Sequence, residues 1–167
     1  MLWRSYSGGM ETPSAGLGTR LRHVLELLDG DVAKVYADLG LDDYRPRFSP
    51  IVRALVAMGP MPIRDLAHAV WVTHSAASQT VAQMSRCGLV TLEAGADARQ
   101  RIVHLTAKAR SVLPTIEAEW AATEAAADEL EAGLPFPLSD VLAATVRALE
   151  RRPFRQRVAE VAPLVSD

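Results

Sequence analysis

Apolar residues recur every three or four positions over residues 17–39, which is the period of one face of an α-helix. Gly40 follows and is well suited to end such a helix. The pattern therefore predicts one long helix with a continuous apolar stripe, and this stripe needs a second surface to cover it. The stripe consists of Leu17, Leu21, Val24, Leu25, Leu28, Val32, Val35, Tyr36 and Leu39.

Three short helical segments are predicted next. A linker at residues 45–48 precedes the first of them, where Ser49 suits the N-cap and Pro50 suits the first helical position. The apolar positions of this segment continue up to the pair Gly59-Pro60, which ends it. We expect it to pack against the two helices that follow.

A tight connection of Trp71 and Val72 joins the second and third short helices. The second is predicted over residues 63–70. The third begins at the N-cap Thr73 and runs to about Cys87, and Gly88 occupies the C′ position, where a left-handed residue is preferred. The inward positions are Leu66, Ala67 and Val70 in the second helix, and Ala77, Val81 and Met84 in the third.

The period of the pattern changes from helical to two after Gly88. Residues 89–93 and 101–105 are short, β-prone and partly alternating, and the loop AGADARQ between them contains Gly and Asp. They predict a two-stranded hairpin. Thr106 closes this hairpin as the N-cap of the next helix.

The last third of the chain is predicted to be helical. One helix covers about residues 107–132, and Pro114 either kinks it or marks its effective start. Residues 133–137 break the chain before two shorter helices, at 139–149 and 153–161. The apolar side of the long helix consists of Val112, Ile116, Trp120, Thr123, Ala127 and Leu130.

Three short helices followed by a hairpin form a winged helix-turn-helix. We therefore predict a mainly α fold, in which three helices and a β-hairpin wing are flanked by N- and C-terminal dimerisation helices. The expected organisation is a disordered tail at 1–16 (with Met10 as an alternative start), a dimerisation helix and linker at 17–46, the winged domain at 47–106, and dimerisation helices at 107–167.

Composition agrees with one helical domain, and charge indicates a partner. Of the 167 residues 49% are hydrophobic and only 5% aromatic, so we expect a mainly aliphatic core. The net charge is −2, but residues 45–110 contain nine basic and three acidic residues, and the remainder contains nine basic and seventeen acidic. A basic middle indicates contact with a polyanion. The alternative is chance segregation of charges on solvated faces, and the acidic run at 117–131 is expected to be such a face.

Targeting signals and membrane spans are not expected. No apolar stretch reaches 18 residues, and the first 16 residues lack the apolar centre of a secretory signal. The single cysteine, Cys87, excludes an intramolecular disulfide and fits a reducing cytoplasm. We expect a structural thiol there, with redox sensing as the alternative.

Motifs for catalysis or metal binding are not found either. Ser75 lacks the glycine pattern of a nucleophile elbow. The histidines are not spaced as metal ligands, so we predict no metal, no cofactor and no enzymatic activity. They are His23, His68, His74 and His104.

Small and polar side chains dominate THSAASQT, residues 73–80. In a winged helix-turn-helix this helix enters the major groove of double-stranded DNA, N-terminal end first. Small side chains allow close approach to base edges, Gln79 suits adenine, and the backbone amides near Thr73 suit a phosphate. A helix that only tolerates close packing is the alternative. The side chains predicted to face DNA are Thr73, His74, Ser75, Ser78, Gln79 and Gln83.

The hairpin supplies a second candidate contact. Arg99 and Arg101 occupy alternate positions near its tip, so that both guanidinium groups can point the same way. An arginine on a protruding wing is suited to the minor groove, where the potential is most negative. Asp97 is placed to orient Arg99 by a charged hydrogen bond. A soluble hairpin with scattered charges is the alternative.

Residues 49–106 resemble the MarR family of transcriptional regulators. GPMPIRDLAHAVWVTHSAASQTVAQMSRCGLV is similar to the family's second helix, turn, recognition helix and Gly-Leu-Val entry to the wing. DARQRIVHLT is similar to its Asp-x-Arg wing motif, which ends in Leu-Thr. The flanking helices agree with the family in length and order.

The resemblance implies an obligate homodimer whose terminal helices intertwine and which binds a pseudo-palindromic operator, usually as a repressor released by a small-molecule effector. It implies that Arg99 enters the minor groove, that Asp97 orients it, and that Ser75, Ser78 and Gln79 are recognition-helix contacts. The effector pocket would lie between the dimer helices and the winged domain. Its candidate lining residues are Tyr36, Phe48 and Trp71, for each of which core packing is the alternative.

The recognition helix also departs from the family pattern. Ala82, Gln83 and Ser85 stand where members often carry charged residues, and Gln79 stands where arginine is frequent. These departures motivate an alternative function from a different class: a winged-helix protein-interaction module that has lost DNA binding.

Overall fold

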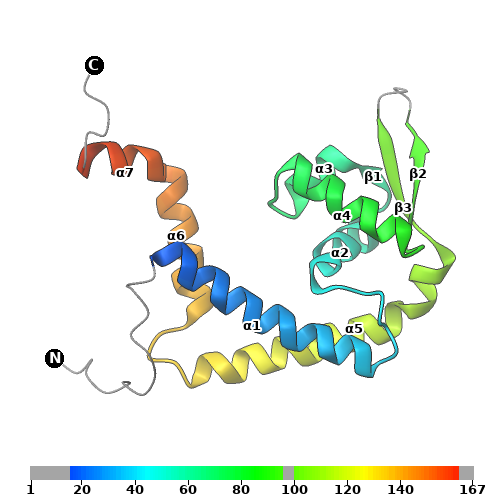
Figure 1. Cartoon of the computed structure of the whole chain (residues 1–167), viewed down its shortest axis with the longest axis horizontal. Helices are drawn as coiled ribbons and strands as arrows, with labels where there is room; N and C mark the ends of the chain where they lie inside the picture. Colours follow the sequence, from blue (N-terminus) through cyan, green and yellow to red (C-terminus); the bar gives the residue numbers. More distant parts are fainter. Residues whose placement is uncertain (1–15, 96–99, 162–167) are drawn as a thin grey trace. The chain divides into compact units, whose positions relative to one another are not determined.

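The computed structural model describes residues 16–95 and 100–161 (Figure 1). It comprises two compact units, Met1–Ile116 and Glu117–Asp167, whose border lies inside one helix. The prediction of a mainly α fold is confirmed. In chain order the elements are α1 (Leu17–Asp38), η1 (Pro46–Phe48), α2 (Ser49–Met58), β1 (Met61–Pro62), α3 (Ile63–Ala69), α4 (His74–Arg86), β2 (Val90–Ala94), β3 (Arg101–Leu105), α5 (Ala107–Ala132), α6 (Leu138–Arg151) and α7 (Phe154–Val161).

Helix α1 ends at glycine, as its sequence predicts. Gly40 has a φ of +73°, and its N–H donates to the carbonyl of Ala37 at 2.9 Å. The N–H of Leu41 donates to the carbonyl of Tyr36 at 2.8 Å. These two bonds form a Schellman motif, in which the left-handed residue is usually glycine because a side chain there is strained.

The apolar stripe of α1 is largely exposed in the single chain. Tyr36 is its one buried member, whereas Leu21 and Leu28 remain 44% and 46% exposed. The surface that the stripe requires is therefore not supplied by the described part of one chain.

The segment between α1 and α2 corrects two predictions. Part of the predicted linker is the short helix η1, and Ser49 is not the N-cap of α2 but its first residue. Its hydroxyl lies 2.9 Å from the Tyr36 hydroxyl and 3.4 Å from the Tyr44 hydroxyl. The serine therefore bonds side chains of other segments instead of the backbone of its own helix.

Most buried side chains are aliphatic, as the composition predicts, and three aromatic rings form one part of the core. Tyr44 packs edge-to-face against both Tyr36 and Phe48, with ring centroids 4.6 and 5.7 Å apart. All three rings are buried. They join α1, the connecting segment and η1 within the first unit.

Helices α2, α3 and α4 share the remaining core of this unit. Gly59 ends α2 with a φ of +81°, and Val70, predicted as the last inward residue of α3, is its half-buried C-cap. The fully or nearly fully buried apolar side chains of this core include Ile51, Val52, Leu55, Leu66, Ala67, Ala77, Val81, Met84, Leu89, Val90, Val103 and Leu105.

The predicted hairpin is present, and a third strand joins it. Strands β2 and β3 pair antiparallel, with Val90 opposite Leu105 and Ala94 opposite Arg101. The short β1 adds to the other edge of β3, with Met61 opposite Val103, which gives the order β1-β3-β2. Because two residues are too few to show a period, the sequence pattern did not predict β1.

Thr106 closes the hairpin as predicted. Its Oγ1 accepts a hydrogen bond from the N–H of Ala109 at 3.1 Å and donates to the carbonyl of Gly88 at 2.7 Å. The side chain therefore caps α5 and ties it to the end of α4. Helix α5 begins at Ala107, so Pro114 lies inside the helix and does not mark its start.

The acidic run at 117–131 is not uniformly solvated, in contrast to the prediction. Glu119 is only 4% exposed, and its Oε1 accepts a hydrogen bond from Thr123 Oγ1 at 2.5 Å. Glu131 accepts from the N–H and Oγ of Ser139 at 2.7 and 2.8 Å. This carboxylate therefore caps the start of α6.

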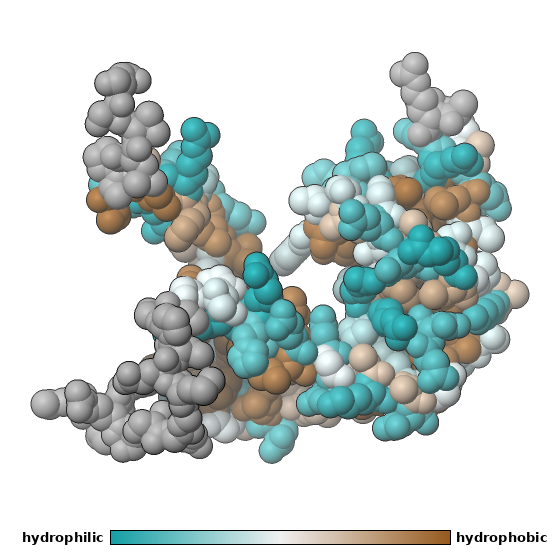
Figure 2. All heavy atoms as spheres, viewed as in Figure 1, coloured by the Kyte–Doolittle hydropathy of each residue, from teal (hydrophilic) through white to brown (hydrophobic). Residues whose placement is uncertain are grey.

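The second unit exposes apolar side chains along α6 and α7. They appear as brown surface at the upper left of Figure 2. These helices are amphipathic, and within the described residues none of their side chains is buried. The exposed apolar residues are Val141, Leu142, Val146, Leu149, Phe154, Val158 and Val161.

Candidate nucleic-acid interface

Helix α4 starts at the predicted cap and buries the predicted face. Thr73 has extended backbone angles, and its Oγ1 accepts a hydrogen bond from the N–H of Ala76 at 3.2 Å. Ala77, Val81 and Met84 are the buried residues of the helix. Because these three positions fix the rotation of α4 about its axis, they also determine which side chains face outward.

The outward line of α4 carries small or uncharged side chains over its first turns. Ser75, Gln79, Ala82 and Arg86 follow one another at intervals of four, three and four residues, and all four are exposed. Of the other predicted contacts, His74 is exposed in the first turn and Ser78 is half-buried beside the line. The predicted polar face therefore exists, and it is narrow.

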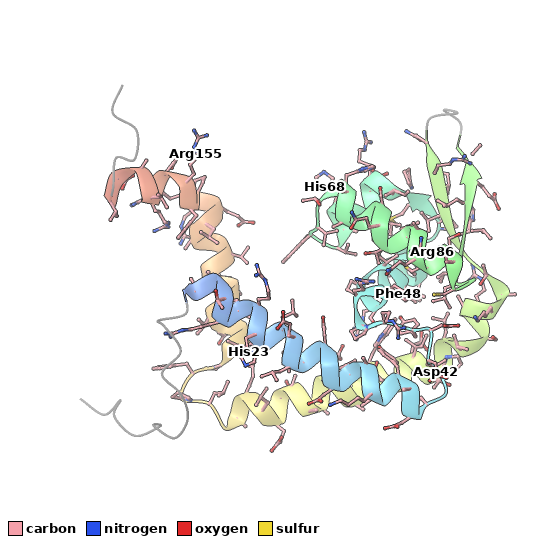
Figure 3. The ribbon with its side chains drawn as sticks, viewed as in Figure 1. His23, Asp42, Phe48, His68, Arg86 and Arg155 are labelled. Carbon is pink, nitrogen blue, oxygen red and sulfur yellow. The ribbon has the colours of Figure 1, made fainter. Side chains whose placement is uncertain are left out.

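Arg86 extends this face and was not among the predicted contacts. It lies one turn beyond Ala82, in the last turn of α4, and projects from the end of the helix farther from His68 of α3 (Figure 3). The helical spacing from Ser75 and Gln79 was sufficient to find it. It places a permanent positive charge on a surface that otherwise lacks one.

Gln83 accepts a hydrogen bond from a second cation, Arg47, which was not among the contacts predicted from the sequence. The Nη2 of Arg47, on η1, donates a hydrogen bond to Gln83 Oε1. Arg47 also acts on Asp29 of α1: burial raises the pKa of the Asp29 carboxyl, and the positive charge of Arg47 lowers it in part. Since 36 residues separate Arg47 from Gln83, only the fold brings them together.

The wing is described on both sides of its tip. The N–H of Gly95 donates to the carbonyl of Gln100 at 3.0 Å, and Arg101 is exposed at the start of β3. Asp97 and Arg99, the other predicted wing contacts, lie outside the described residues. Their roles stay predictions.

Trp71, in the turn between α3 and α4, differs most from its predicted environment. Trp71 is 86% exposed, so it neither packs in the core nor lies in a closed pocket. Tyr36 and Phe48, the other candidate pocket residues, are buried core side chains. Trp71 instead borders a cavity of about 270 Å³, together with Arg64, Ala67, His68, Val72 and His74.

A second cavity, of about 390 Å³, lies between η1, the start of α2, the α3–α4 turn and α4. Its walls are mainly apolar, and Arg47 is the one charged residue that lines it. The lining side chains include Pro50, Ile51, Val70, Val72, Ala76 and Thr80.

The described residues show neither a metal site nor a membrane-spanning helix. Over residues 16–95 and 100–161, no three His, Cys, Asp or Glu side chains come together as a metal site would require. None of the helices in these ranges is long and apolar enough to cross a membrane. Cys87 is the half-buried C-cap of α4, and its carbonyl accepts a hydrogen bond from Lys108 Nζ at 2.8 Å.

The fold is similar to that of solved transcriptional regulators and of a solved protein–DNA complex. MOSR of M. tuberculosis, solved in complex with DNA, is 22% identical with a TM-score of 0.65, over 84% of this chain and 100% of that chain. MepR of S. aureus, also in complex with DNA, is 14% identical with a TM-score of 0.62, over 83% and 98%. PcaV of Streptomyces coelicolor, solved with its natural ligand, is 18% identical with a TM-score of 0.58, over 84% and 99%.

No model of a known protein family matches the sequence, and no curated protein matches it. The structural likeness therefore carries the comparison. It shows that the chain has the winged-helix fold of these solved structures, which confirms the fold expected from the sequence.

Proposed function

We propose that this chain is a dimeric, sequence-specific DNA-binding transcriptional regulator, and more specifically a repressor. The observation that carries the proposal is the outer face of α4. It is exposed and built from small or polar side chains, with Arg86 at its far end. MOSR and MepR, which share the fold, were solved bound to DNA.

In this proposal α4 lies in the major groove with its N-terminal end leading. Ser75, Ser78 and Gln79 contact base edges, since their side chains both donate and accept hydrogen bonds. His74 and Arg86 contact the phosphates on either side of the groove. Thr73 caps the helix so that its free amides face the DNA.

The wing supplies the minor-groove contact. Arg99 enters the groove and Asp97 orients it. Arg101 contacts the phosphates beside the groove, since it is exposed at the start of β3, next to the tip of the wing. Gln83 reaches DNA only after it exchanges Arg47 for a phosphate or a base edge. Arg47 is thus a further candidate phosphate contact at this edge of α4.

A homodimer completes the proposed regulator. The uncovered stripe of α1 and the apolar faces of α6 and α7 are the surfaces we assign to the partner subunit. A two-fold axis would present the two α4 helices to successive major grooves, which requires a pseudo-palindromic operator with half-sites about one turn apart.

For the small-molecule effector we propose the cavity of about 390 Å³ beside α4. Its apolar walls and the guanidinium of Arg47 suit a small organic acid with an apolar ring. A carboxylate there would compete with Gln83 for Arg47. Benzoate titration tests this: benzoate should release bound DNA from the wild-type chain, and an equal release from Arg47→Ala would rule the site out.

The alternative function is a winged-helix protein-interaction module without DNA binding. The observation in its favour is that Arg86 is the only Arg or Lys on the whole of α4. Both functions predict a folded, oligomeric protein, so they differ only in what α4 and the wing bind.

Salt-titrated binding to the promoter DNA beside its own gene separates these two functions. The regulator should bind this duplex far more tightly than a scrambled duplex of equal length, and the logarithm of its affinity should fall steeply with the logarithm of salt. Equal, weak binding of both duplexes by a confirmed dimer at low salt would reject the regulator.

A further inference from the structure

Trp71 occupies a backbone position that the same motif elsewhere gives to glycine. The N–H of Trp71 donates to the carbonyl of His68 at 3.3 Å, and the N–H of Val72 donates to the carbonyl of Ala67 at 3.0 Å. These bonds form a Schellman motif at the end of α3, and Trp71 has a φ of +57°.

Two other helices of the first unit end in the same way. After α1 the left-handed residue is Gly40, with a φ of +73°, and after α4 it is Gly88, with a φ of +70°. Gly88 donates to the carbonyl of Ser85 and the next residue, Leu89, to that of Met84, at 3.0 and 2.9 Å. Glycine adopts this backbone without strain, whereas tryptophan does not.

Burial of the Trp71 side chain does not offset this backbone strain. This side chain is 86% exposed, although it is the largest apolar side chain of the winged domain. A strained, exposed aromatic residue indicates a role outside the fold itself, because replacing it by glycine would remove no buried contact.

The surroundings of the indole indicate which partner it meets. The cavity of about 270 Å³ that it borders is lined by Arg64, His68 and His74, which approach from α3 and the first residue of α4. All three carry N–H groups that can donate to a phosphate oxygen. The acidic side chain beside them is Asp65, whose Oδ1 lies 3.3 Å from Arg64 Nε and orients that guanidinium.

We propose that this cavity, with Trp71 as its outer wall, is a binding site for the DNA sugar-phosphate backbone. The indole face packs on a deoxyribose, and Arg64, His68 and His74 hold the adjoining phosphate. The inference rests on the proposed function, since the site lies at the end of α4 that leads into the major groove. It adds Trp71, Arg64 and His68 to the contacts of the recognition helix.

Trp71→Gly is the decisive substitution because it separates binding from folding. It relieves the left-handed strain and removes the ring, so the variant should have a Tm equal to or above that of the wild-type chain. Its DNA dissociation constant should rise on the order of tenfold, the low end of the loss seen for an aromatic side chain that stacks on a base. Trp71→Phe keeps a ring and should recover most of the affinity.

The measurement uses two duplexes, the promoter DNA and a scrambled duplex at low salt. Because sugar and phosphate contacts carry no sequence information, Trp71→Gly should weaken both by the same factor. Arg64→Ala should weaken both as well and reduce the salt slope by about one. Arg155→Ala, the same charge change on exposed α7, is the matched control and should change neither (Figure 3).

The outcomes separate this inference from the proposed function. If Trp71→Gly binds either duplex as tightly as the wild type does, the backbone site is overturned. This holds even where selectivity for the promoter DNA supports the regulator. Loss of promoter selectivity with an intact effect of Trp71→Gly on both duplexes overturns the regulator alone. A lower Tm of Trp71→Gly would also overturn the inference, because it would show that Trp71 serves the fold.

Discussion

Replacing Leu21 and Leu28 of α1 together by glutamine should dissociate the proposed dimer. The two side chains lie seven residues apart on one face and remain 44% and 46% exposed. Complete burial of a leucine contributes about 1.5–3 kcal/mol, so covering the remaining half of each contributes about 1 kcal/mol. A two-fold axis repeats both contacts, which gives about 4 kcal/mol, or roughly a thousandfold in the dimer dissociation constant.

Sedimentation equilibrium over a wide concentration range measures this constant directly. Glutamine has nearly the same helix propensity as leucine, so the change isolates burial from helix formation. Glu26→Gln, on the opposite side of α1, is the matched control and should leave the constant unchanged. A wild-type chain that is a stable, folded monomer would refute the reasoning, as would a double variant that dimerises as tightly as the wild type.

Four further predictions each concern a single side chain. Thr73→Ala removes the cap of α4 and should lower the free energy of unfolding by about 1 kcal/mol in urea denaturation, with Thr73→Ser close to wild type; equal loss in both would exclude the cap. Ser49→Ala breaks the hydroxyl contacts to the two buried tyrosines and should lower the free energy of unfolding by about 1 kcal/mol. An unchanged denaturation midpoint would contradict this. Arg86→Ala should reduce the salt slope of DNA binding by about one, and an unchanged slope and affinity would remove Arg86 from the interface. Arg99→Ala should weaken DNA binding by about 1–3 kcal/mol, and an unchanged affinity would remove Arg99 from it.

The rotation of the recognition helix was predictable from the sequence because it depends on short-range periodicity. Ala77, Val81 and Met84 repeat at helical spacing, and once they face the core, Ser75 and Gln79 must face outward. The same spacing also places Arg86 on this face. Helix caps and terminators such as Thr73 and Gly88 bond neighbouring backbone groups, so they too can be predicted from the sequence.

The contacts around the site were not predictable because they join segments far apart in the chain. Arg47 reaches Gln83 across 36 residues. Arg64 and His74 line one cavity only because α3 and α4 meet at the turn that Trp71 makes. The high hydrophobicity of tryptophan argued for burial, and only its position after α3 placed it in water.

The sequence by itself determined the α-helices, the β2–β3 hairpin, their order and most of the sides they bury, since helix and strand periods, caps and glycines operate over a few residues. The tertiary structure decided which polar groups found one another: Ser49 bonded two tyrosines instead of capping α2, Glu119 became buried, and two residues of β1 joined the wing. The physical reason is that burial and long-range hydrogen bonding depend on which distant segments pack against a residue. A local sequence pattern does not specify those segments.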